Sequence, residues 1–220
     1  MAENKKKVWQ EYTEGLLDFP SGKAAWEKEF IQAVFNNIAK GNLRKVLEVG
    51  CSNGRFLKWF YREYHCEGYG IDNNTTGFTA GDIVQFKVGD ARNLPYQDEL
   101  FDMVFSLGLV EHFTPKEKYR ILKEQNRVLK KGGYLICQVP LLSFSLNFIY
   151  TKIVYDFRKG YQHFRTTERE MKNYFKRLGL KIVLSKRIGC LFELNFFKKL
   201  TKFRFFKNLL ATEILIIGKK

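Results

Sequence analysis

The sequence of 220 residues lacks most features that mark secreted, membrane-spanning or zinc-binding proteins. No apolar run approaches the about 20 residues that a helix needs to cross a bilayer. The start, MAENKKKVWQEY, has no apolar stretch after its lysines, so we expect no secretory signal. The four cysteines form neither a CxxC pair nor a zinc-ligand spacing. We therefore predict reduced thiols, no metal site and a cytoplasmic protein.

Acidic residues are scarce in the second half of the chain. Residues 1–113 hold 13 Lys and Arg against 16 Asp and Glu, whereas residues 114–220 hold 25 against 7. The net charge of +15 therefore comes from the second half. Such a surface attracts nucleic acid, lipid headgroups or an acidic substrate, or it serves only to keep the protein soluble.

Short apolar runs alternate with helical patterns along the chain. The strand candidates are residues 45–50, 69–73, 83–90, 101–108, 134–140, 181–189 and 211–220. Strands that alternate with helices indicate a mostly parallel sheet covered on both faces. Because no clear helix separates the last two candidates, we predict that the final strand runs antiparallel to the others.

Two helices have recognisable ends. TPKEKYRILKEQNRVLKKGG (114–133) begins at Thr114, Glu117 completes a capping box, and the two glycines at its end are predicted to stop it. TTEREMKNYFKRLGL (166–180) has the same spacing at Thr167 and Glu170.

The stretch VLEVGCSNGRF (46–56) predicts a strand, a tight turn and the start of a helix. Gly50 and Gly54 leave bare backbone at the helix start, where N–H groups and the positive helix end can face a ligand. Asp72 ends the next strand, 18 residues after Gly54. That is near the about 20-residue spacing of an acid that binds ribose hydroxyls.

Polar residues also follow the third and fourth strands. Asp90 lies in VGDARNLPY, and Glu111 and His112 follow FDMVFSLG. Because the carboxyl ends of parallel strands meet at one edge, these side chains are predicted to line one pocket with Asp72.

In this order the motifs resemble those of the class I S-adenosylmethionine-dependent methyltransferases, from about Lys45 to the final strand. The matching stretches are LEVGCSNG, GIDNN, GDARNLP, FDMVFSLGLVEHF and RVLKKGGYLICQVP. The resemblance implies a Rossmann-like α/β fold: a seven-stranded, mostly parallel sheet with its last strand antiparallel and helices on both faces. One departure is Ser52, which stands at the middle glycine of the family's frequent GxGxG.

The resemblance further implies S-adenosyl-L-methionine as the cofactor. The cofactor-binding residues that it implies are Glu48, Gly50, Cys51, Gly54, Asp72, Asn73, Asp90, Ala91 and Leu107. A dinucleotide fits worse because the third glycine of GxGxxG is missing. His112 is the candidate catalytic base; a structural histidine at a helix start is the open alternative.

We take residues 1–220 as a single methyltransferase domain and divide it into three parts. An N-terminal helical cap (1–42), in which Trp9 and Tyr12 are candidate lid residues, precedes the cofactor-binding core (43–140). The remainder (141–220) holds a substrate-side insert and the C-terminal strands. The insert (141–165) and the basic, aromatic segment 191–210 are open to three interpretations: packing on the sheet, peripheral contact with an anionic membrane, or nucleic-acid binding.

The acceptor predicted from these features is a small molecule or a lipid-like compound. The Asn/Asp-Pro-Pro-Tyr/Phe signature of exocyclic-amine methyltransferases and the Pro-Cys of cytosine-ring enzymes are both missing. Their absence makes nucleic acid the less favoured partner. An RNA methyltransferase and a non-catalytic S-adenosylmethionine-binding regulatory protein are the alternatives.

Overall fold

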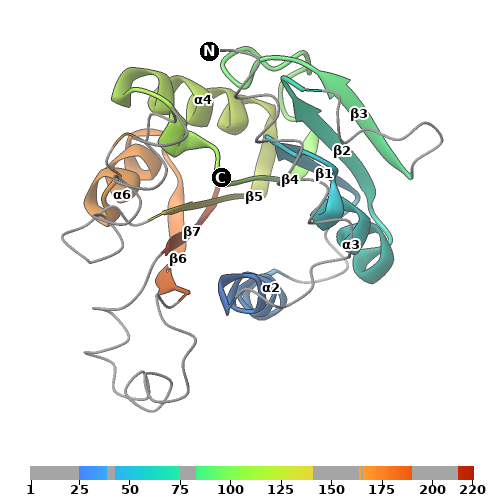
Figure 1. Cartoon of the computed structure of the whole chain (residues 1–220), viewed down its shortest axis with the longest axis horizontal. Helices are drawn as coiled ribbons and strands as arrows, with labels where there is room; N and C mark the ends of the chain where they lie inside the picture. Colours follow the sequence, from blue (N-terminus) through green and yellow to red (C-terminus); the bar gives the residue numbers. More distant parts are fainter. Residues whose placement is uncertain (1–24, 39–42, 75–82, 141–163, 165, 190–212) are drawn as a thin grey trace, which may run out of the picture.

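A seven-stranded sheet forms the centre of the computed structural model, which describes residues 25–38, 43–74, 83–140, 164, 166–189 and 213–220 (Figure 1). The strands follow the order β3-β2-β1-β4-β5-β7-β6. Their bounds are β1 Lys45–Val49, β2 Glu67–Asp72, β3 Val84–Val88, β4 Phe101–Leu107, β5 Leu129–Pro140, β6 Lys181–Ile188 and β7 Glu213–Lys219.

Strand direction confirms the predicted topology. β1 to β5 pair in parallel, and β7 runs antiparallel to both β5 and β6. The carboxyl ends of β1, β2, β4 and β5 therefore meet at one edge of the sheet, and β7 begins there. This is the edge at which open α/β sheets bind ligands.

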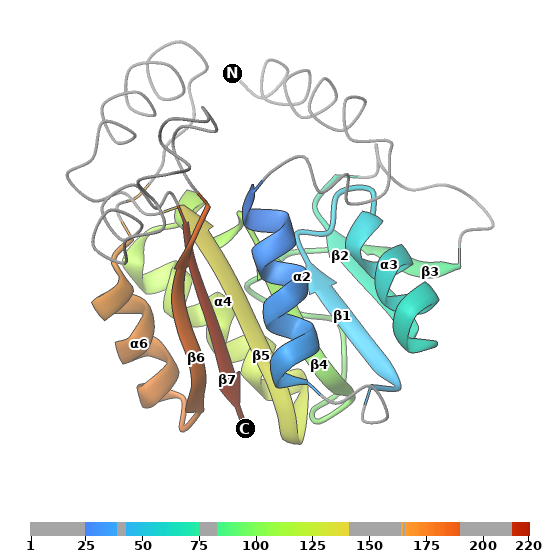
Figure 2. The same ribbon diagram turned by 90° about the horizontal axis from the view of Figure 1, so that it is seen from below.

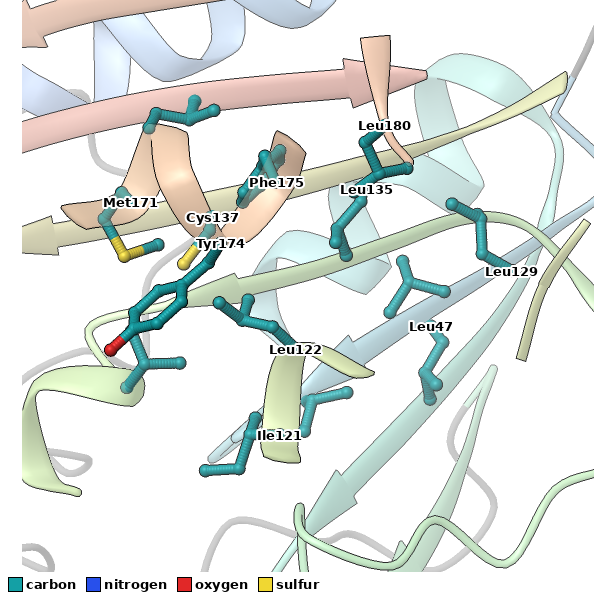
Figure 3. Close-up of a cluster of buried hydrophobic side chains, with 14 of the residues drawn as sticks. Leu47, Ile121, Leu122, Leu129, Leu135, Cys137, Met171, Tyr174, Phe175 and Leu180 are labelled. Atoms are coloured by element: carbon teal, nitrogen blue, oxygen red, sulfur yellow. The ribbon is translucent and has the colours of Figure 1, made fainter. Parts of the chain in front are cut away.

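Helices cover both faces of the sheet (Figures 1 and 2). α2 (Ala25–Asn37) and α3 (Arg55–Tyr64) lie on one face, and α4 (Pro115–Val128) and α6 (Glu168–Arg177) lie on the other. The first pair buries Phe30, Val34 and Phe60 against the sheet. On the second face, Figure 3 shows Tyr174 and Phe175 of α6 in a cluster of buried side chains from α4 and the strands.

α3 owes its position to one apolar face. Phe56, Trp59 and Phe60 are buried, while Arg62 is exposed. Apolar residues at i, i+3 and i+4 form a stripe along a helix, so this spacing alone turns one face toward the sheet. The packing anchors the end of the turn that precedes the helix.

α4 begins as predicted but ends earlier. Thr114 accepts a hydrogen bond from the Glu117 N–H at 3.4 Å, and the Glu117 carboxylate accepts one from the Thr114 N–H at 3.1 Å. The helix ends at Val128, because residues from Leu129 onward belong to β5 and Leu129 pairs with Phe101. The predicted stop at the two glycines was therefore wrong.

The same two glycines instead complete the sheet. The Gly132 N–H donates to the Lys220 carbonyl at 2.8 Å, and the Lys220 N–H donates to the Gly133 carbonyl at 3.0 Å. These bonds join positions that are far apart in the sequence, so no local pattern could indicate them.

α6 is shorter than the predicted helix, and one of the two hydrogen bonds of the predicted capping box is observed. Thr167 accepts from the Glu170 N–H at 3.2 Å. The Glu170 carboxylate accepts from the Tyr174 hydroxyl at 2.7 Å. The helix ends at Arg177, and Gly179 follows with φ +77°. Glycine commonly takes this conformation just after a helix.

Several predicted features lie outside the described residues: the lid candidates Trp9 and Tyr12, most of the insert, and the basic segment 191–210. The described part of the N-terminal cap is α2, which packs on the sheet. Among the residues that the structure describes, no helix is long and apolar enough to cross a membrane.

Candidate cofactor site

The turn between β1 and α3 needs glycine at two positions. Gly50 and Gly54 have φ of +77° and +64°, a conformation that L side chains rarely adopt. A Cβ on Gly50 would stand 2.9 Å from Leu109, and one on Gly54 would stand 2.7 Å from the ring of Phe86. At both positions only glycine combines the left-handed backbone with the small volume available. The backbone at the start of α3 is therefore not covered by a side chain of either residue.

Ser52 takes a left-handed conformation in the middle of this turn, with φ 48°. Its N–H donates to the Asp72 carboxylate at 2.9 Å. Charge-assisted hydrogen bonds of this kind are among the stronger ones. The serine thus fits the turn without a glycine, and its backbone ties the turn to the end of β2.

Asp72 lies at the predicted place beside the turn. Its carboxylate also accepts from the Asn74 N–H at 3.1 Å. Burial raises the pKa of Asp72, while N–H groups of Ser52, Asn74 and Asn73 act in the opposite direction. A carboxylate has about four lone-pair positions. Accepting from this loop therefore leaves capacity for the hydroxyls of a ribose.

Glu48 and Cys51 flank the turn from inside the protein. Glu48 is 4% exposed, and its Oε2 has no hydrogen-bond partner in the described part of the chain. Burial raises the pKa of Glu48 well above its usual range, and the charge of Arg55 opposes that shift. Burial also raises the pKa of the Cys51 thiol. Cys51 therefore stays protonated and contributes packing rather than a nucleophile.

Asp90 is already bound within its own loop. Its two carboxylate oxygens accept from the Arg92 guanidinium at 2.8 and 3.0 Å, which lowers the pKa of Asp90. Arg92 also reaches Glu117 of α4 at 2.6 Å. The sequence did not indicate this arginine as a partner. Any adenine contact by Asp90 must share the carboxylate with Arg92, with half-buried Ala91 between the two residues.

Leu107 ends β4, and its half-buried side chain packs against the cluster beneath α2 and α3. The Gly108 N–H then donates to the Gln138 carbonyl of β5 at 3.1 Å. A short 3-10 helix, η2 (Val110–His112), follows and carries the predicted acid and histidine. The structure therefore places both at the same sheet edge as Asp72.

Glu111 is the buried member of the Glu111–His112 pair. It is 2% exposed, no described residue forms a hydrogen bond with its Oε2, and burial raises its pKa to about 8. The His112 Nε2 lies 3.9 Å from Glu111 Oε1. His112 thus lies beside a buried carboxyl group whose protonated form is favoured by burial.

A second buried acid, Glu213 of β7, was missed by sequence reasoning. Gln138 donates to its carboxylate at 2.6 Å. Burial and the charge of Glu111 raise the pKa of Glu213 to about 8. The only local signal is an acid that opens the strand EILIIGK, directly before four apolar residues.

Lys118 was also missed. It is fully buried on α4, and its Nζ donates to the Thr166 hydroxyl at 2.6 Å and the Phe164 carbonyl at 3.3 Å. Burial lowers its pKa, while Glu170 and Glu111 act in the opposite direction. This lysine links α4 to the segment that precedes α6.

Sequence comparison connects this arrangement to known proteins. Residues 47–137 match a family described as a methyltransferase domain. The chain is 34% identical over 95 residues to mouse (Mus musculus) "Probable tRNA methyltransferase 9B", covering 43% of this chain and 21% of that protein. It is 37% identical over 100 residues to phthiotriol/phenolphthiotriol dimycocerosates methyltransferase 1 of Mycobacterium ulcerans (strain Agy99), covering 42% and 36%. The chain thus spans about a fifth and about a third of the length of these relatives.

Comparison with solved structures shows that the fold is shared with a known methyltransferase. A SAM-dependent methyltransferase from Archaeoglobus fulgidus superposes with a TM-score of 0.65 at 21% identity, over 87% of this chain and 94% of that one. The matched span contains Glu48, the glycine turn, Asp72 and Asp90. Residues 47–137 are therefore similar to a methyltransferase domain, and the fold is one that a SAM-dependent methyltransferase also has.

Proposed function

We propose that this protein transfers the methyl group of S-adenosylmethionine to a small-molecule or lipid-like acceptor. The observation that carries the proposal is the glycine turn closed onto Asp72 at the carboxyl edge of the sheet, inside the matched methyltransferase domain. When bound, the cofactor supplies a methyl group on a sulfonium centre, whose leaving group is already excellent.

The residues present fit this cofactor. The bare turn from Gly50 to Gly54 admits a ligand against the backbone, and a side chain at either glycine would meet its neighbours. Asp72 offers a carboxylate for ribose hydroxyls, and Glu48 has a buried oxygen without a partner. A ligand that satisfies this oxygen removes a desolvation penalty of about 1–3 kcal/mol.

The chain's own contribution to catalysis is to place the acceptor and hold its proton. Holding two reactants in line supplies much of the acceleration in such a transfer. His112 takes the acceptor's proton, and its Nε2 lies 3.9 Å from the carboxyl group of the neighbouring Glu111. Accordingly, His112→Gln is expected to lower turnover and leave cofactor affinity unchanged. Equal turnover by His112→Gln and the wild type would remove the histidine from the chemistry.

The acceptor class is supported by one relative and by composition. The mycobacterial relative is named for a lipid-like acceptor, and the insert at 141–165 is rich in apolar residues. Cytoplasmic location and peripheral contact with an anionic membrane stay predictions.

An RNA acceptor is the second candidate. It is favoured by the relative named as a tRNA methyltransferase and by the excess of 25 Lys and Arg over 7 Asp and Glu in residues 114–220. RNA held mainly by such charges would bind with a steep dependence on salt. A non-catalytic, cofactor-binding regulatory role is the third possibility, and turnover on any acceptor would exclude it.

One experiment separates the candidates. Purified protein is incubated with methyl-labelled S-adenosylmethionine and, in parallel, with bulk tRNA or with a lipid extract, and label is counted in each acceptor. We expect label in the lipid fraction and only weak tRNA binding. Label in tRNA, together with affinity that falls steeply between about 50 and 200 mM salt, would favour the RNA candidate instead.

A further inference from the structure

Among the residues that the structure describes, three buried polar atoms near the start of α3 have no hydrogen-bond partner. They are Glu27 Oε2, Glu48 Oε2 and Arg55 Nη1. The side chains of Glu27 and Arg55 are 3% and 11% exposed. Nearly all buried polar groups in folded proteins have partners, and each exception needs an explanation. Three exceptions of complementary charge at one place indicate a ligand.

The three groups are held by different elements. Glu27 belongs to α2, Glu48 to β1, and Arg55 is the first residue of α3. Arg55 Nη2 lies 2.6 Å from Glu27 Oε1, and the charge of Arg55 acts directly on Glu48. The glycine turn connects Glu48 to Arg55, so the cluster lies beside the proposed cofactor site.

Aromatic packing fixes the position of the ion pair. The Arg55 guanidinium lies 4.6 Å from the centre of the Phe56 ring. That ring packs against Trp26 and Phe30 of α2, at 6.0 and 5.4 Å between centres. These contacts hold α2 beside the start of α3, and each member of the ion pair keeps one atom for another group.

The charges of these atoms define the ligand. A simple anion would meet Arg55 but also two carboxylates, and a simple cation would meet the carboxylates but also Arg55. A group that carries an ammonium and a carboxylate satisfies all three atoms. The α-amino acid end of S-adenosylmethionine is such a group.

We propose that Glu27 and Arg55 bind the α-amino acid end of the cofactor, with Arg55 donating to its carboxylate and Glu27 and Glu48 accepting from its ammonium. The assignment rests on the proposed function, because it concerns the same cofactor. Glu27 lies outside the matched residues 47–137, so the site extends beyond the matched domain to α2.

The test compares two ligands that differ in this end alone. S-adenosylhomocysteine and 5′-methylthioadenosine are both uncharged at sulfur, but only the first carries the amino acid group. Arg55→Met keeps the apolar stem and removes the donor. By calorimetry, we expect S-adenosylhomocysteine to lose affinity by about 10- to 100-fold and methylthioadenosine to lose none. Glu27→Gln should act in the same direction.

Two further variants keep the result interpretable. Arg62→Met changes an exposed arginine on the same helix, 62% exposed, and should leave both affinities unchanged. If Arg55→Met leaves Glu27 unpaired and unfolds, the double variant Glu27→Gln/Arg55→Met removes both charges and takes its place. Unchanged methylthioadenosine binding confirms that either variant has folded.

Two results would overturn the assignment. Loss of both ligands to the same extent would mean that the pair only supports the fold, and full retention of S-adenosylhomocysteine would mean that it does not touch the amino acid end. A wild type that binds methylthioadenosine but gains nothing from the amino acid group would also refute this assignment alone. Binding of neither ligand by the wild type would refute the proposed function as well.

Discussion

Replacing Gly54 with alanine should destabilise the protein for two separable reasons. The residue has φ +64°, and a Cβ there would lie 2.7 and 2.8 Å from two atoms of the Phe86 ring. The left-handed conformation costs alanine about 1–2 kcal/mol, and overpacking typically costs about 1–3 kcal/mol. We therefore expect Gly54→Ala to lower the free energy of unfolding by about 2–5 kcal/mol.

Gly179 provides the matched control. It has φ +77°, and nothing lies within 4 Å of the position of its missing Cβ. Gly179→Ala should therefore show the conformational cost of about 1–2 kcal/mol alone. Urea unfolding of both variants measures the difference, which reports the contact between the turn and β3.

A second substitution tests the steric part directly. In a Gly54→Ala background, Phe86→Leu shortens the side chain that the new methyl group would meet. We expect the double variant to recover part of the lost stability. If Gly54→Ala cost no more than Gly179→Ala, the close approach of Phe86 to the turn would be wrong, and with it the explanation for this glycine.

Three other predictions concern buried or capping groups. The pKa values of Glu111 and Glu213 are about 8 in the folded chain, above the ordinary value of 4.5. Between about pH 4.5 and pH 8, the folded chain therefore binds more protons than the unfolded chain. The stability that these two protonated groups contribute to the folded chain is fully present below about pH 4.5 and is lost as the pH rises toward about 8. The free energy of unfolding of Glu213→Gln should therefore increase relative to that of the wild type as the pH rises, by at most about 1.4 kcal/mol per pH unit. Urea unfolding from pH 5 to 8 measures this difference, and a difference that does not change with pH would contradict the prediction. Lys118→Met removes the buried donor to the Thr166 hydroxyl and the Phe164 carbonyl and should cost about 1–3 kcal/mol in urea unfolding, whereas no measurable cost would mean that the lysine is not buried as described. Thr114→Ala removes the cap of α4 and should cost about 1 kcal/mol, and no change in the unfolding midpoint would argue against the observed capping box.

The sheet and half of the site could be predicted because their signals are local. Most strands contain a short apolar run, and Thr114 and Glu117 identify a helix start from four consecutive residues. Asp72 was found because β2 follows α3 directly, which fixes the distance in sequence from Gly54 to the end of the next strand. Local periodicity and strand order were sufficient for these features.

The remaining features depend on contacts between distant positions. α4 ends at Val128 because Leu129 pairs with Phe101, and the sequence contains no signal for that pairing. Glu27 and Arg55 are 28 residues apart and meet only because α2 packs beside α3. Likewise, Glu213 approaches Glu111 because an antiparallel strand begins at the edge where β4 ends. Arg92 is near Asp90 in sequence, but nothing in GDAR distinguishes an ion pair from a solvated arginine.

The central claim is that the glycine turn and Asp72 bind S-adenosylmethionine. Its most direct test is a calorimetric titration of the ligand-free protein with S-adenosylmethionine, beside Asp72→Ala. We expect micromolar binding by the wild type and a loss of at least about 10-fold in the variant, since a hydrogen bond to a carboxylate contributes about 1.5–3 kcal/mol. A folded wild type that does not bind, or a variant that binds equally well, would contradict it.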